Sequence, residues 1–231
     1  MRCSNRKANV MVDRNERQKT TLLYVMDPHC GWCFGFGVVI EQLFEHYRND
    51  DQVRFEVLPG GLFVPKILTS KDFAEGKRSI WERISHLSGV TVSNSYFANV
   101  IGEGGYLDSE VPCRVINTAS HLCPDRLIPF MEALLTQEFT HGRNISDYIS
   151  TESVIEKFGF DLGELRTVFD SELMAKTTCE NFRRASTIAD GYPVLFAATE
   201  SGEMKALAKG FAPLDRLKKR VDEIVNSTQA V

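Results

Sequence analysis

The sequence predicts an α/β fold in which a large helical block interrupts the part that contains the strands. A strand–helix–strand pattern covers residues 20–58, and such a unit places its two strands side by side and parallel. Strand character returns at residues 193–198. Between these two parts, from residue 65 onward, apolar residues recur at helical spacing. We therefore expect one α/β domain made from two separated parts of the chain, with helices inserted between them.

The first strand is predicted at residues 20–26, a β-branched and aromatic run that is typical of a buried strand. Residues 27–29, Asp-Pro-His, end this strand. The apolar side chains that follow are spaced as on one face of a helix: Phe36, Val39, Ile40, Leu43 and Tyr47. The strand-to-helix turn therefore falls at Cys30, which is at or just before the first helical residue.

The remaining elements follow from the same kinds of signal. Residues 53–58 alternate apolar and polar side chains as in a strand, and Pro59-Gly60-Gly61 ends it. Helix starts are expected at Ser70 and at Ser109, which is an N-cap candidate. Further helices are expected at residues 127–139, from Ser150 or Thr151 to Phe158, and at residues 162–187. The last elements are a strand at 193–198, a turn at 201–202, a hairpin strand at 205–209 and a helix at 214–225.

These elements divide the chain into four segments. Residues 1–19 form a predicted leader with six basic and two acidic side chains, a composition typical of a solvated, disordered tail. Residues 20–64 and 182–231 are expected to form the two parts of the α/β domain. Residues 65–181 are expected to form an all-helical insertion between them.

The composition is that of a soluble globular protein, with 43% hydrophobic and 25% charged residues in a chain of 231. A net charge of −4 gives no general affinity for nucleic acid. No apolar run is long enough for a membrane span, which needs about 20 residues, and residues 1–19 lack the apolar stretch of a secretory signal. We therefore expect a cytoplasmic protein without nucleic-acid or membrane partners. No pattern in the sequence specifies an oligomeric state.

The stretch Cys30-Gly31-Trp32-Cys33 carries the clearest chemical signal. A helix N-terminus has unpaired N–H groups and a partial positive charge, which favour a thiolate over a thiol. The thiolate is the nucleophile in disulfide exchange, so this position predicts a reactive dithiol. A zinc site usually needs four ligands, and the sequence holds no second CxxC and no HExxH. No bound metal is therefore expected.

A strand–helix–strand unit with CxxC at the start of its helix, followed later by a hairpin and a final helix, resembles the thioredoxin fold. The large helical insertion makes the chain more specifically similar to the DsbA superfamily. Within that superfamily, residues 27–36 resemble the cytoplasmic, FrnE-type DsbA-like predicted protein-disulfide isomerases. Residues 108–114 and 142–147 fit the same group, and Gly191-Tyr192-Pro193 matches the loop that holds its cis-proline. The resemblance covers residues 20–225.

The resemblance implies a dithiol–disulfide couple. Cys30, at the helix tip, is expected to attack a disulfide, and Cys33, one turn further in, is expected to resolve the mixed disulfide. Pro193 is expected to be cis, and Tyr192 to present backbone groups to an extended substrate segment. Trp32 is expected at the surface beside the first cysteine, either as an apolar platform for substrate or as a residue that only packs over the helix start.

Two further residues are candidate modulators of the thiol pKa values. His29 is expected either to stabilise the thiolate when protonated or to be an exposed loop residue without a role. Asp27 is expected either to shuttle protons to the second cysteine or only to end the strand. Cys113 lies in a matched stretch, as an alternative disulfide partner or as a buried apolar thiol. Cys123 and Cys179 carry no signal beyond that of buried apolar thiols.

The leading functional prediction is a thiol–disulfide oxidoreductase, or protein-disulfide isomerase, that acts on protein or small-molecule thiols and disulfides. It needs no bound cofactor, and glutathione or another thiol is its expected redox partner. Kappa-class glutathione transferases and 2-hydroxychromene-2-carboxylate isomerases share the architecture but typically carry serine at the first cysteine position, so two retained cysteines favour redox chemistry. A non-catalytic redox sensor is the third alternative. The Gly-Trp dipeptide is compatible with an oxidase, a reductase or an isomerase.

Overall fold

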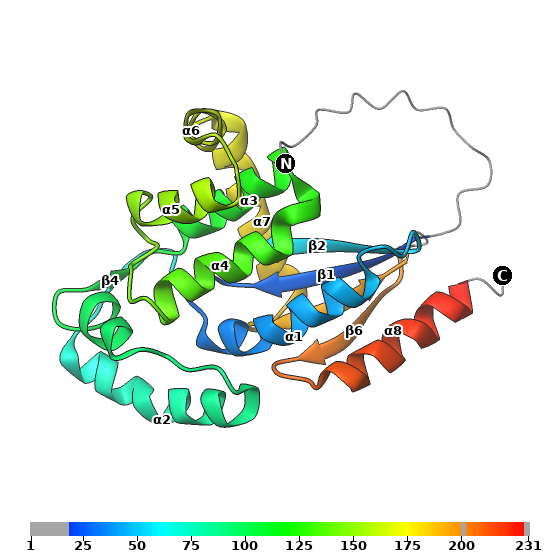
Figure 1. Ribbon diagram of the computed structural model, residues 1–231, viewed down its shortest axis with the longest axis horizontal. Coiled ribbons are helices and arrows are strands. Elements are labelled where there is room, and N and C mark those ends of the chain that lie inside the picture. The colour runs from blue at the N-terminus through cyan, green and yellow to red at the C-terminus, as the bar shows by residue number, and fades with distance from the viewer. Residues whose placement is uncertain (1–18, 200–201, 229–231) are drawn as a thin grey trace.

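A four-stranded sheet forms the centre of the residues that the computed structural model describes, which are 19–199 and 202–228 (Figure 1). The strand order is β2-β1-β5-β6. β1 pairs in parallel with β2 and antiparallel with β5, and β5 pairs antiparallel with β6. The bounds are β1 Thr20–Met26, β2 Val53–Pro59, β5 Val194–Ala198 and β6 Met204–Lys209. The sheet therefore joins the two parts of the chain that the sequence marked as α/β. Except for Lys19, the predicted leader lies outside the described residues.

β1 is a central strand with both faces covered, which explains its continuous apolar sequence. Leu22 and Tyr24 face one side and belong to the larger core, whereas Leu23 and Val25 face the other and belong to a smaller one. Successive side chains of a strand point to opposite faces, so one short run of residues supplies both cores. The prediction of a buried first strand is confirmed.

Helices cover both faces of the sheet (Figure 1). On one side, α1 (Gly31–Tyr47) and α8 (Leu214–Thr228) contribute to the larger core with Leu22 and Tyr24. On the other side, α7 (Glu172–Ile188) contributes Ala185 to the smaller core. The predicted apolar face of α1 is buried throughout: Phe36, Val39, Ile40, Leu43 and Tyr47. The helix that carries the CxxC is therefore held against the sheet along its whole length.

The insertion is mostly helical. Its α-helices are α2 (Lys71–Ser88), α3 (Glu110–Leu122), α4 (Leu127–Phe139), α5 (Ile149–Lys157) and α6 (Leu162–Phe169). A π-helical turn, η1 (Tyr96–Val100), and a 3-10 turn, η2 (Pro124–Arg126), accompany them. It is not all-helical as predicted, because β3 (Ile67–Leu68) pairs antiparallel with β4 (Tyr106–Leu107). Two-residue strands are too short to show the alternation by which a strand is predicted.

The predicted helix starts have mixed outcomes. Ser70 caps α2 as expected, since its hydroxyl accepts a hydrogen bond from the N–H of Phe73 at 3.2 Å. Ser109 precedes α3, but its hydroxyl makes no cap and bonds to other segments instead. Ser150 and Thr151 lie inside α5, which begins at Ile149, so the prediction that either caps this helix was wrong.

An aromatic cluster joins the insertion to the start of α1. The ring centroid of Phe34 on α1 lies 4.9 Å from that of Phe139 on α4 and 6.3 Å from that of Trp81 on α2. Trp81 and Phe139 are also 5.0 Å apart. Such contacts add to the free energy of area burial, so the insertion is fixed over the CxxC end of the helix. Among the described helices, none is both long and apolar enough to cross a membrane.

Candidate active site

The CxxC motif sits where the sequence placed it, at the start of α1. Cys30 is the N-cap residue, with φ −82° and ψ 112°. The N–H groups of Cys33 and Phe34 donate to its carbonyl oxygen at 2.9 and 3.1 Å, which closes the first helical turn. No acidic side chain lies in that turn. The first turn itself therefore contributes no carboxylate that would oppose the partial positive charge of the helix N-terminus.

The two thiols are free and differ in accessibility. Cys30 is 8% exposed, whereas Cys33 is fully buried. Burial raises the pKa of Cys33 well above its usual value, and the hydrogen bond and charge of the neighbouring Cys30 act in the same direction. Only the first cysteine is therefore reached from outside, in agreement with the order of attack that the resemblance implies.

A hollow of about 170 Å³ opens beside Cys30. It is lined by His29, Cys30, Gly31, Trp32, Leu62, Phe63, Phe73, Lys77, Ile80, Trp81, Ile84, Tyr96 and Leu107. Trp32 is partly buried, and the guanidinium of Arg83 lies 5.8 Å from its ring centroid. Both the platform and the packing interpretations of Trp32 match this position, because it lines the hollow and also contacts the core.

Gly31 allows this hollow to lie so close to the dithiol. A Cβ atom at that position would lie 2.9 Å from the ring of Trp81 and 3.1 Å from Ile84. Real Cβ atoms essentially never come within 3.0 Å of another heavy atom, so a larger residue would require the Trp81 side chain or the helix start to shift. Packing against α2 therefore explains why glycine stands at the first position between the two cysteines. The sequence alone did not indicate this.

The Gly-Tyr-Pro loop faces the accessible thiol. The Tyr192–Pro193 peptide bond is cis, as the resemblance implied. The Cys30 thiol donates to the carbonyl oxygen of Tyr192 at 3.7 Å. The phenol of Tyr192 lies near both cysteines and Asp27, and burial together with these charges raises its pKa to about 12. Backbone atoms of this loop are therefore within reach of a substrate bonded to the first cysteine.

Asp27 is fully buried and makes three hydrogen bonds through its carboxylate. It accepts from the N–H of His29 at 2.9 Å, from the N–H of Leu62 at 2.8 Å and from the hydroxyl of Ser109 at 3.1 Å. Burial raises its pKa, although these donors and the charge of His29 oppose the rise. Its backbone N–H lies 3.5 Å from the sulfur of Cys33. Asp27 therefore does more than end the strand, because it joins three loops beside the buried thiol.

His29 is 3% exposed, so the prediction that it could be an exposed loop residue was wrong. Its Nδ1 lies 2.8 Å from Oε1 of Glu138 on α4. Its Nε2 lies 3.0 Å from the carbonyl oxygen of Asp108 and 3.1 Å from the hydroxyl of Ser146. Both ring nitrogens are occupied by these partners, so neither is available to bond to Cys30. Burial alone would lower the pKa of His29, but Glu138 and Asp27 raise it to about 9.

Glu138 was not among the predicted site residues. It is fully buried in the helix at residues 127–139, where most neighbouring side chains are apolar. A charged residue is almost never fully buried unless it is paired. An acidic residue on the apolar face of a predicted helix was therefore a signal for a buried partner, although the sequence could not say which one.

The remaining cysteines differ in their surroundings. Cys113 on α3 is fully buried, and burial raises its pKa, with Asp27, Asp108 and Glu110 adding to the rise. It therefore lies near the site, but the predicted alternative disulfide stays a prediction. Cys179 on α7 is exposed, which contradicts its interpretation as a buried apolar thiol. Within residues 19–199 and 202–228, no group of three or more His, Cys, Asp or Glu side chains is arranged to hold a metal ion.

No protein-family model matches the chain, and no curated protein sequence matches it. Solved structures do. A "putative protein disulfide isomerase" from Nitrosomonas europaea is 22% identical, with 90% of this chain and 98% of that chain covered and a TM-score of 0.79. The cytosolic disulfide reductase DsbM from Pseudomonas aeruginosa is 19% identical, with 88% and 98% covered and a TM-score of 0.73. Oxidoreductase DsbA from Xylella fastidiosa is 12% identical, with 92% and 88% covered and a TM-score of 0.56. The chain has the DsbA-like thioredoxin fold.

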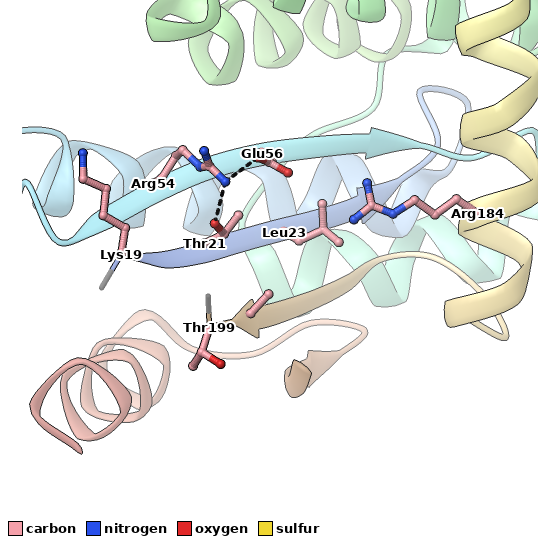
Figure 2. A pocket seen from close by; sticks show the side chains of 8 residues that line it. Lys19, Thr21, Leu23, Arg54, Glu56, Arg184 and Thr199 are labelled. Carbon is pink, nitrogen blue, oxygen red and sulfur yellow. Dashed lines mark hydrogen bonds and ion pairs between the residues drawn. The ribbon is translucent and has the colours of Figure 1, made fainter. Parts of the chain in front are cut away.

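In this DsbA-like fold a second hollow lies at the other end of β1 (Figure 2). It is basic, with Lys19 before β1, Arg54 on β2 and Arg184 on α7 around it. Arg54 is held by an ion pair with Glu56 at 2.9 Å and donates to the Thr21 hydroxyl at 3.1 Å. This hollow lies at the start of β1, whereas the dithiol lies just after the end of β1. It therefore belongs to a different region from the dithiol.

Proposed function

We propose that the protein is a thiol–disulfide oxidoreductase that uses the Cys30–Cys33 couple. The observation that carries the proposal is the asymmetry of the two thiols. Cys30 keeps 8% exposure at a helix N-terminus, beside the hollow, whereas Cys33 is fully buried one turn behind it. A nucleophile needs access to its substrate, whereas a resolving thiol only needs access to the first sulfur. The free state of both thiols corresponds to the reduced form of such a couple.

The reaction proceeds in two exchanges. The Cys30 thiolate attacks one sulfur of a substrate disulfide, forms a mixed disulfide and releases one substrate thiolate, which takes up a proton. The Cys33 thiolate then attacks the Cys30 sulfur and releases the second substrate thiolate, which is also protonated. Two electrons pass to the substrate, and the Cys30–Cys33 disulfide remains. The reverse sequence oxidises a substrate dithiol.

The second exchange requires Cys33 to lose a proton. Burial opposes this loss because it raises the pKa of that thiol. Asp27 is the candidate acceptor, since its charge acts on Cys33, its backbone N–H contacts the Cys33 sulfur and burial raises the pKa of its carboxyl group. We assign Asp27 the role of proton acceptor for Cys33, which adds to its structural role.

Substrate contacts are assigned to the cis-proline loop and to the hollow. An extended substrate segment pairs with the backbone of Tyr192, in front of Pro193, as in strand addition. An apolar side chain of the substrate enters the hollow beside Trp32, whose lining is mostly aromatic and aliphatic. Lys77 also lines this hollow and supplies a positive charge for an acidic substrate group.

Glutathione is the thiol partner that we propose. The structure of the cytosolic disulfide reductase DsbM from Pseudomonas aeruginosa with GSH matches this chain with a TM-score of 0.70, at 20% identity over 88% of this chain. A cytosolic location and a reducing direction are proposed on the same basis.

The test is trapping and turnover with glutathione and with a protein disulfide. Cys33→Ser is expected to accumulate a mixed disulfide at Cys30, detected by mass spectrometry, and to lose turnover. Cys30→Ser is expected to form none. Cys179→Ser, at an exposed position, is the matched control and is expected to turn over like the unaltered protein. Turnover that persists in Cys30→Ser would refute the proposal, and a single reversible oxidation without turnover would favour a redox sensor.

A further inference from the structure

A buried ion pair joins the loop before the dithiol to the helical insertion. The side chains of His29 and Glu138 are both fully buried and lie 2.8 Å apart. They come from the β1–α1 loop and from the last turn of α4. Breaking a buried pair on one side leaves an uncompensated charge, so this contact is not interchangeable with a surface salt bridge.

Hydrogen-bond partners define the protonation state of His29. Its Nδ1 faces a carboxylate oxygen and its Nε2 faces the carbonyl oxygen of Asp108. The carbonyl oxygen only accepts, whereas the Ser146 hydroxyl, 3.1 Å from Nε2, can accept from a protonated nitrogen or donate to a bare one. An imidazole that donates to both Glu138 and Asp108 carries a proton on each nitrogen. The other oxygen of Glu138 accepts from the N–H of Ile145 at 3.3 Å. We take the Asp108 carbonyl oxygen, which lies closer to Nε2 than the Ser146 hydroxyl does, as the acceptor, so that the pair is an imidazolium and a carboxylate.

Two further titratable groups lie near this pair. Asp27, at the end of β1, lies near enough to His29 to favour its charged form. Tyr96, on the π-helical turn, lies near both Glu138 and Cys30. His29 and Cys30 are adjacent in the chain and line the same hollow, whereas Glu138 is not among its lining residues. The positive end of the ion pair is therefore the end nearer the accessible thiol.

We propose that Glu138 is a positioning residue for the dithiol, which holds His29 as a buried imidazolium beside Cys30 and thereby increases the thiolate fraction of that cysteine. The inference rests on the proposed function. It assigns the helical insertion a part in tuning the thiol, through a residue 109 positions away in the chain.

Glu138→Gln tests the charge with little change of shape. A glutamine amide donates to Nδ1 of a neutral imidazole, while its carbonyl oxygen accepts from the N–H of Ile145. The neutral ring then donates through Nε2 to Asp108. Every hydrogen bond of the site is kept, and only the two charges are lost. The Glu138→Gln variant is therefore expected to fold. A second variant, His29→Asn, removes the imidazolium itself.

The first measurement is the alkylation rate of Cys30 by iodoacetamide, located by mass spectrometry, as a function of pH. An increase of one unit in a thiol's pKa lowers its thiolate fraction about tenfold and raises its intrinsic nucleophilicity about threefold. We expect alkylation at pH 7 to slow about threefold in Glu138→Gln, and its pH profile to move to higher pH. The exposed substitution Glu156→Gln is the control and is expected to leave the rate unchanged.

The double variant separates tuning from a merely structural role. If the pair acts as a unit, the double variant His29→Asn/Glu138→Gln slows alkylation as much as Glu138→Gln alone. His29→Asn leaves a buried carboxylate unpaired, so it slows alkylation at least as much. The dithiol–disulfide equilibrium with glutathione is expected to shift about tenfold toward the disulfide in all three. Unchanged rates and equilibria in Glu138→Gln would overturn the inference, as would a further loss in the double variant.

One measurement needs no variant. Nitrogen NMR of histidine-labelled protein is expected to show both ring nitrogens of His29 protonated at pH 7, and a neutral ring would overturn the inference. The proposed function fails separately, because a protein without thiol–disulfide turnover would fail the trapping experiment whatever the state of His29.

Discussion

The hydroxyl of Tyr192 lies where a side chain at Gly60 would begin. A Cβ atom built on Gly60 meets the phenol ring and its hydroxyl at distances that atoms do not adopt. The Pro59-Gly60-Gly61 stretch was predicted only to end a strand, but the structure shows that it also makes room for the residue before the cis-proline. The N–H of Gly60 donates to the carbonyl oxygen of Met26 at 2.7 Å, so this backbone cannot easily move aside.

Gly60→Ala is therefore expected to displace Tyr192 and to lower disulfide-exchange turnover, since the Tyr192 carbonyl faces the Cys30 thiol. Overpacking of this kind costs about 1–3 kcal/mol of unfolding free energy. Turnover with a protein disulfide and chemical denaturation measure the two effects. Gly191→Ala is the control in the same loop, where an added Cβ meets nothing within 4 Å. Equal turnover in both variants would contradict the assigned role of Tyr192.

Glu132→Gln is expected to stabilise the protein at neutral pH. Glu132 on α4 is buried against Gly37 of α1, and its Oε1 has no hydrogen-bond partner among the described residues. Burial raises the pKa of this carboxyl well above 4.5, and the charge of Glu41 adds to the rise. The folded state then binds a proton that the unfolded state has lost, so stability falls as pH rises above about 4.5.

Glu132→Gln is expected to increase the free energy of unfolding by about 1–3 kcal/mol at pH 7. This increase is expected to vanish below about pH 4. Urea denaturation at several pH values measures it. Glu41→Gln, at an exposed position on α1, removes only the repulsion between Glu41 and Glu132. It is expected to increase the free energy of unfolding by less than Glu132→Gln does. A loss of stability in Glu132→Gln at pH 7 would show that its carboxylate has a favourable partner.

The ion pair between His29 and Glu138 also loses stability as pH rises, but in a higher pH window than Glu132. The pKa of His29 is raised to about 9 in the folded state, from an ordinary value of about 6.5. Its contribution to stability is therefore complete below pH 6.5 and is lost as pH rises through 9. The free energy of unfolding is expected to fall by about 3 kcal/mol as this contribution is lost. Urea denaturation between pH 6 and pH 10 measures the fall. Glu138→Gln is expected to show no loss in this window, and a parallel decline in both proteins would rule out His29 as its source.

Phe139→Ala is expected to loosen the insertion from the active-site helix. Its ring lies 4.9 to 5.0 Å from the rings of Phe34, Trp81 and Tyr96, and it follows Glu138 in the chain. Removing a buried phenylalanine side chain costs about 3–5 kcal/mol of unfolding free energy. Chemical denaturation measures this cost, and Leu173→Ala, at a side chain that is 63% exposed, is the control. A cost below 1 kcal/mol would mean that the cluster does not hold the insertion.

Sequence patterns alone predicted the elements that depend on local spacing. β1 at residues 20–26, α4 at residues 127–139 and the start of α1 at Cys30 are where periodicity and composition placed them. Alternation and helical spacing are properties of neighbouring residues, so a short window contains all the information that these predictions need. The CxxC at a helix start was visible for the same reason.

Only the tertiary structure decided which distant residues meet at that helix start. Ser109 looked like a helix cap, but it bonds to Asp27, 82 positions away. His29 looked free to face solvent, but it meets Glu138, 109 positions away, and Cys30 meets Tyr192 across 162 positions. Such contacts depend on how α4, α3 and the cis-proline loop pack around β1, and no local window of the sequence contains that packing. The sequence therefore located the CxxC thiols at a helix start, and the packing of the insertion determined their surroundings.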